Sequence, residues 1–136
     1  MMAIIICVFS IAALLPFVVW YFRAIVASRR NVQLSTRLQE LTGITSEKVK
    51  ADDFARLLQL VQLCPEQEDD QSDIRAVGAY YNVLAMLGRM ARTVAPDLAA
   101  WFERERESCS YFAAVALDRR ISHSRELFSQ QLADRL

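Results

Sequence analysis

The hydrophobic pattern begins with a run from Met2 to Phe22 that contains no charged residue. At about 1.5 Å of rise per residue, roughly 20 helical residues cover the ~30 Å hydrocarbon core of a bilayer. Trp20 and Tyr21 precede Phe22 at the end of this run, where aromatic side chains typically mark the membrane–water interface. The pattern therefore predicts a transmembrane helix over residues 1–22.

Two other interpretations of this run fit less well. A buried core helix is usually shorter or carries a polar stripe, and a cleaved signal peptide has a basic segment before a shorter apolar run. No lysine or arginine side chain precedes this run, and cleavage after Ala27 would place Ile25 where a small residue is preferred. A retained membrane span is the favoured interpretation.

Basic residues follow the run at once, at Arg23, Arg29 and Arg30. The positive-inside rule then places the C-terminal part in the cytoplasm of a single-pass protein of the cell membrane. The same side chains can bind anionic headgroups, at about 1 kcal/mol each near the surface, so membrane lipid is an expected partner. The predicted membrane-anchor residues are Trp20, Tyr21, Phe22, Arg23, Arg29 and Arg30.

Residues 23–42 have apolar positions at the spacing of a paired helix, which predicts a juxtamembrane stalk that continues the membrane helix. Asn31 would occupy a position where a buried asparagine selects register and a dimer. The same face could instead pack on later helices of the chain. Gly43 suits the left-handed position that ends a helix. The candidate interface residues on the stalk are Asn31, Leu34, Leu38 and Leu41.

The pattern from 43 to 136 predicts a small helical bundle of three to four helices, so the fold class is all-α. Phe54, Leu57 and Val61 mark one face of a first helix, which Pro65 ends. Leu60 and Leu63 widen this face, so we expect the helix to be buried on more than one side. Residues 66–73 are mostly acidic and predict a solvated loop. A second helix over 74–91 is apolar on most sides, as in the middle of a bundle.

From Pro96 onward the chain contains no further glycine or proline. Leu98, Trp101, Phe102, Cys109 and Phe112 predict the core stripe of a long helix, with Trp101 and Phe102 central. The alternating charges of residues 103–107 predict a solvated face.

The C-terminal part of this helix leaves two questions open. Either Ser122 caps a last segment with Leu127, Phe128 and Leu132 inward, or the helix runs on. Arg119 and Arg120 form either a polar helix end or a basic cluster that meets a partner, and they complete the candidate interface.

Composition excludes several classes of function. Sixteen basic and sixteen acidic residues give a net charge of zero, whereas a nucleic-acid binder is expected to be basic, so nucleic acid is not an expected partner. One histidine and three distant cysteines fit neither a zinc nor a di-iron site. No phosphate-binding glycine loop and no nucleophile motif occurs, so we expect no enzyme and no cofactor.

Two hypotheses about function remain. The first is a non-enzymatic, membrane-anchored interaction module, an accessory or scaffold subunit at the cytoplasmic membrane face, which binds a protein partner or itself. The alternative is a membrane-tethered small-ligand sensor or regulator, with a pocket between helices that bear Tyr80, Tyr81, Trp101 and Tyr111.

Overall fold

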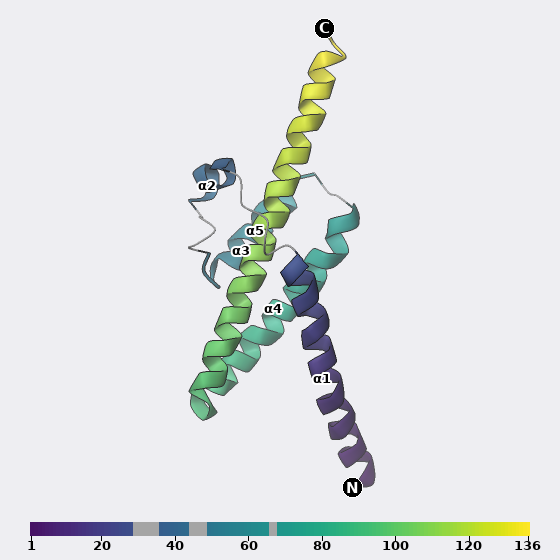
Figure 1. Cartoon of the computed structure of the whole chain (residues 1–136), viewed down its shortest axis with the longest axis vertical. Helices are drawn as coiled ribbons and strands as arrows, with labels where there is room; N and C mark the ends of the chain where they lie inside the picture. Colours follow the sequence, from purple (N-terminus) through teal and green to yellow (C-terminus); the bar gives the residue numbers. More distant parts are fainter. Residues whose placement is uncertain (29–35, 44–48, 66–67) are drawn as a thin grey trace.

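The computed structural model describes residues 1–28, 36–43, 49–65 and 68–136. These residues form helices and no strand, which confirms the all-α class for the described part of the chain (Figure 1). The helices are α1 (Met2–Ser28), α2 (Thr36–Thr42), α3 (Asp53–Leu63), α4 (Glu68–Val94) and α5 (Pro96–Ala133).

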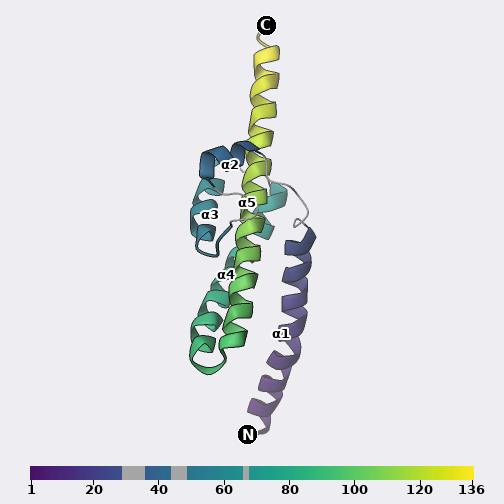
Figure 2. The same cartoon turned by 60° about the vertical axis from the view of Figure 1, so that its left-hand side comes forward.

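Helix α1 continues through the predicted membrane boundary at Phe22 as far as Ser28, with Pro16 inside it. It is long and apolar enough to cross a membrane, and its apolar window is not covered by the rest of the protein. Figures 1 and 2 show that the C-terminal end of α1 lies against the bundle, while its N-terminal end projects away.

The predicted stalk lies only partly within the described residues. Arg29, Arg30, Asn31 and Leu34 lie outside them, as does the side chain of Leu41. Gly43 adopts a φ of 67° and donates its N–H to the carbonyl oxygen of Gln39 at 2.8 Å, so this glycine ends α2 as predicted.

Helix α3 has the predicted register, because Phe54, Leu57 and Val61 are all buried. The helix ends before Pro65, as the sequence predicts. Leu63, which was expected to be buried on a second side of this helix, is 82% exposed, so that expectation is wrong.

Helix α4 begins at Glu68, so the predicted acidic loop is wrong over residues 68–73. The physical reason is that acidic side chains stabilise the positive end of the helix dipole. Neither glycine nor proline interrupts the chain from residue 68 until Gly78. The acidic cluster therefore starts the helix instead of preceding it.

Helix α5 is one continuous helix from Pro96 to Ala133, so Ser122 does not begin a separate segment. Pro96 occupies the first turn, where its missing N–H costs nothing. The core lies where α4 and α3 pack on the middle of α5, and Leu57, Leu84 and Phe112 are almost completely buried there. Trp101, predicted to be central, is only half-buried at its edge.

The two ends of the molecule are formed by different parts of the chain. Helices α4 and α5 form a hairpin whose turn, at Ala95, points toward the same end of the molecule as the N-terminus (Figures 1 and 2). The last turns of α5 project past the other helices at the opposite end. We call residues 122–133 the C-terminal arm. Its Leu127, Phe128 and Leu132 are exposed, so of the two alternatives the helix runs on and these side chains do not point inward.

Candidate functional site

The end of α1 and the α4–α5 hairpin meet at a junction built from one aromatic pair and one ion pair. The ring of Phe22 stacks on that of Tyr80 with centroids 4.7 Å apart and an angle of 7° between the planes. One residue further along α1, the Nε of Arg23 lies 3.1 Å from the Oε1 of Glu105 on α5. The C-terminal end of α1 is thus joined to the bundle by consecutive side chains.

The junction carries a carboxylate inside the protein. Glu105 is 8% exposed, although it stands in the charge run that the sequence predicted to be solvated. Its position explains the difference, because Phe102, Glu105 and Cys109 follow each other at helical spacing on the core stripe. A charged residue in register with core positions was the signal that sequence reasoning missed.

Burial at the junction suppresses acid–base reactivity. Burial raises the pKa of the Tyr80 hydroxyl well above its ordinary value, and the nearby Glu105 carboxylate adds to this. Burial, again with a contribution from Glu105, raises the pKa of the Cys109 thiol to about 12. Both groups stay protonated at neutral pH, so neither is poised as a base or a nucleophile.

A groove of about 360 Å³ opens beside the ion pair. It lies between α1 and α5 and is lined by the charged pair Arg23 and Glu105 and by Trp20. The remaining lining residues are Ala24, Val26, Ala27 and Ser108. This groove differs from the pocket predicted between the tyrosines, because Tyr80 is stacked on Phe22 and Tyr81 is engaged in a second polar cluster.

The second cluster surrounds Arg106. Its Nη2 donates to the hydroxyl of Tyr81 at 2.7 Å, and the same hydroxyl donates to the carbonyl oxygen of Ala51 at 2.7 Å. Its Nη1 donates to Glu103 at 2.9 Å, and the guanidinium lies 4.8 Å from the Tyr81 ring centroid. The hydroxyl of Ser110 also donates to the carbonyl of Ala51, at 3.2 Å. The cluster therefore holds the segment before α3 against α4 and α5.

This cluster also fixes the charge of Arg106. Burial lowers its pKa, but the hydrogen bonds to Tyr81 and Glu103 outweigh burial, so the pKa is raised. Arg106 therefore stays a cation and has a structural role.

The predicted membrane-anchor residues fall into two sets, exposed residues and residues that contact the bundle. Trp20 and Tyr21 are exposed, as an aromatic belt requires, whereas Phe22 and Arg23 contact Tyr80 and Glu105 of the bundle. Sequence reasoning could not separate these roles, because the two partners lie far along the chain.

The predicted interface residues divide as well. Leu38 is completely buried in the core, which supports packing of its face on the chain's own helices. Arg120 is 4% exposed and its Nη1 donates to the carbonyl of Val61 at 3.0 Å, so its assignment to a partner surface is wrong. Arg119 beside it is exposed and stays available.

Metal-binding and redox groups are spread out in the described part of the chain. There, no three side chains of the His, Cys, Asp and Glu types lie together so that they could hold a metal ion. Cys7, Cys64 and Cys109 are free thiols. The geometry of the described residues thus offers a groove, two polar clusters and exposed apolar faces.

Comparisons of this chain with protein-family models, with curated proteins and with solved structures find no match.

Proposed function

We propose that this chain is a single-pass membrane protein whose helical bundle is a non-enzymatic interaction module at the cytoplasmic membrane face, in an accessory or scaffold role. The observation that carries the proposal is the exposed apolar surface of α1. An apolar helix that the protein does not cover needs another apolar environment, and its length suits a bilayer. The proposal also rests on the exposed Trp20 and Tyr21 at its end.

The C-terminal arm supports the interaction part of the proposal. Leu117, Ile121, Phe128 and Leu132 lie on one face of α5, at i, i+4, i+11 and i+15. The first is buried and the second half-buried in the bundle, while Phe128 is 69% and Leu132 63% exposed. An apolar face that continues beyond the bundle is what an amphipathic helix presents to a partner helix.

The experiment purifies the full chain from membranes in a mild detergent and reads the mass of the complex by native mass spectrometry. We expect a second copy or a protein partner at a fixed stoichiometry. Phe128→Asp with Leu132→Asp should release it. Gln130→Asp with Ala133→Asp places the same charges on the other side of the arm and should not. A wild-type chain that is monomeric in the detergent and in cross-linked membranes would refute the interaction module.

The orientation has its own test. The arginines that follow the apolar run, with none before it, favour a cytoplasmic C-terminus. A reporter fused after Leu136 should be active only if it is of a type that works in the cytoplasm. Activity of a reporter that works only on the outer side of the membrane would reverse the orientation.

One observation favours the alternative function. The groove beside Arg23 and Glu105 has apolar walls and two opposite charges, a combination typical of a small-ligand site. A membrane-tethered sensor would retain a small molecule in the same native mass measurement. Arg23→Gln should then remove that molecule without changing any protein stoichiometry.

A further inference from the structure

The end of the α4–α5 hairpin carries an exposed apolar stripe that the proposed function does not use. On α4, Val83, Met86, Met90 and Val94 are between 51% and 85% exposed. Their spacing of i, i+3, i+7 and i+11 places them on one face of the helix. Leu98, just past the turn, is 48% exposed. We call residues 83–98 the hairpin end.

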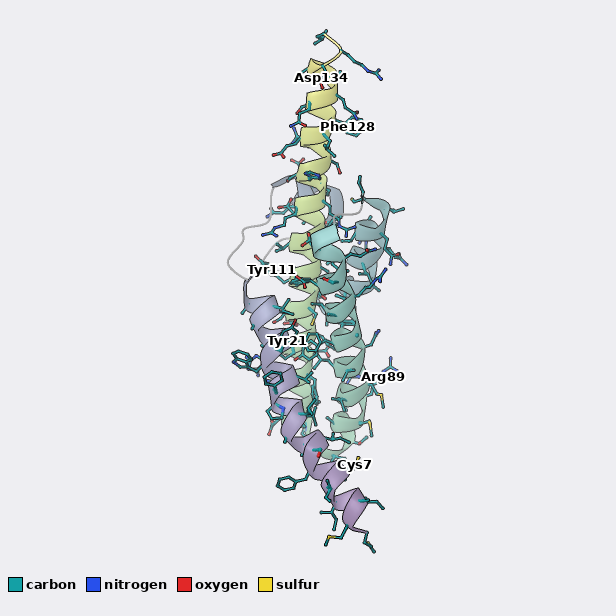
Figure 3. The ribbon with its side chains drawn as sticks, turned by 90° about the vertical axis from the view of Figure 1, so that its right-hand side faces the viewer. Cys7, Tyr21, Arg89, Tyr111, Phe128 and Asp134 are labelled. Atoms are coloured by element: carbon teal, nitrogen blue, oxygen red, sulfur yellow. The ribbon has the colours of Figure 1, made fainter. Side chains whose placement is uncertain are left out.

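The hairpin end reaches the level of the apolar part of α1 along the long axis of the molecule. In Figures 1 and 2 the turn of the hairpin points toward the same end of the molecule as the N-terminus, and Figure 1 shows the two diverging sideways. Figure 3 shows Arg89 of α4 at a level between Tyr21 and Cys7 of α1. The junction contacts at Phe22 and Arg23 hold the two parts together. A bilayer that surrounds the apolar part of α1 therefore also meets the hairpin end.

The charges of the hairpin end suit a lipid surface. Arg89 and Arg92 are exposed, and Asp97 is the one acidic residue among residues 83–98. Arginines beside an apolar stripe bind lipid phosphates while the stripe enters the boundary between headgroups and acyl chains. Long arginine side chains reach from apolar surroundings to the polar layer, and flexible methionines adapt to an irregular surface.

We propose that the hairpin end is a second membrane contact, with its apolar stripe in the interface of the leaflet that Arg23 faces. Membrane helices tilt by up to ~40°, and a tilt of α1 in the direction that raises the hairpin end brings it toward the depth of the headgroups instead of the hydrocarbon centre. This proposal rests on the proposed function in one respect, because it requires that α1 spans the bilayer.

The test uses the full chain in vesicles of equal parts phosphatidylcholine and phosphatidylglycerol. Three variants carry Cys64→Ser and one environment-sensitive nitrobenzoxadiazole probe each. One bears it on Cys7, and the other two also carry Cys7→Ser and bear it at Met90→Cys or Phe128→Cys. Phe128 is the matched control for Met90, because their side chains are 69% and 62% exposed. Figure 3 shows Phe128 far from Arg89, the neighbour of Met90 in the sequence. The buried Cys109 stays unlabelled in the folded protein.

The readout is the emission wavelength and its quenching by lipids that carry a spin label near the headgroup or deep in the acyl chain. We expect the Met90 probe to be blue-shifted and quenched by the shallow label, and the Phe128 probe to escape both lipid labels. A Met90 probe that emits as in water would overturn the proposal. A blue shift without lipid quenching would also overturn it, because a second copy of the chain would then cover the stripe. If the Cys7 probe escapes the deep label, α1 does not span, and the proposed function fails with it.

Discussion

Replacing Arg106 tests whether this member of the alternating charge run on α5 is held inside the fold by its hydrogen bonds. Arg106→Met keeps an unbranched side chain with similar helix propensity but removes the guanidinium and its hydrogen bonds. The side chain of Arg106 is 14% exposed and donates to the Tyr81 hydroxyl at 2.7 Å. Arg104, two residues earlier, is exposed, and Arg104→Met is the matched control.

The magnitude follows from the contacts. A hydrogen bond that involves a charged group contributes ~1.5–3 kcal/mol, and a guanidinium over an aromatic ring at a part-exposed site ~0.5–1 kcal/mol. Glu103 is 43% and Asp52 93% exposed, so solvent screens both ion pairs and each adds less than ~1 kcal/mol. We expect Arg106→Met to lower the free energy of unfolding by ~2–4 kcal/mol and Arg104→Met to change it by less than ~0.5 kcal/mol.

The assay is denaturant unfolding of the full chain in a mild detergent, followed by circular dichroism. A double-mutant cycle with Tyr81→Phe isolates the pair, and we expect a coupling energy of ~1–3 kcal/mol. If both arginine variants cost the same small amount and the coupling is zero, then Arg106 is solvated. The cluster around Ala51 would then not hold the segment before α3.

Three further predictions use the same preparation. Arg120→Met should lower the free energy of unfolding by ~1.5–3 kcal/mol, because the buried guanidinium donates to the carbonyl oxygen of Val61. Arg119→Met, at an exposed position, should change it by less than ~0.5 kcal/mol, and equal effects would contradict the structural role of Arg120. Leu38→Ala should lower the free energy of unfolding by ~2–5 kcal/mol because it leaves a cavity in the core, while Glu40→Ala on the exposed side should be nearly neutral. A neutral Leu38→Ala would mean that this leucine does not pack in the core. Cys109 should resist alkylation in the folded state up to about pH 10 and react after unfolding, and rapid labelling of the native protein would contradict its buried position. Because the pKa of the folded-state thiol is raised to about 12, the free energy of unfolding should fall as the pH rises above the ordinary thiol pKa of ~8.5.

Local signals in the sequence were sufficient for the helix boundaries that depend on backbone chemistry. Gly43 ends α2 in the left-handed region, and α3 ends before Pro65. Pro96 begins α5. The spacing of Phe54, Leu57 and Val61 gave the buried face of α3 correctly. These features are set by neighbours within one or two helical turns, so they can be derived without knowing the tertiary structure.

The charged residues inside the fold could not be assigned in this way. Glu105 and Arg120 look solvated because charged side chains are rarely buried, yet each meets its partner from a distant part of the chain. The C-terminal arm presents the opposite case, apolar residues that are not buried. Leu127, Phe128 and Leu132 have core-like spacing, but periodicity identifies an apolar face and not the element that covers it.

Apart from Leu63 on α3, the exposed large apolar side chains of the described residues fall into two groups along the molecule. The apolar part of α1 and the hairpin end lie toward one end, and the C-terminal arm lies at the other. Because Phe22 and Arg23 join α1 to Tyr80 and Glu105, the direction of α1 and the direction of the arm are coupled. On the proposed function, lipid would cover the first group and a partner helix the second. The bundle would then hold the arm at a fixed orientation to the membrane, which a flexible tether could not do.

Glu105→Gln keeps the shape of the junction but removes its ion pair. If the coupling is real, this change should widen the angular distribution of the arm relative to the bilayer, measured by distances from a probe at Phe128→Cys to labelled lipid headgroups. An unchanged distribution would mean that the aromatic stack alone fixes the junction.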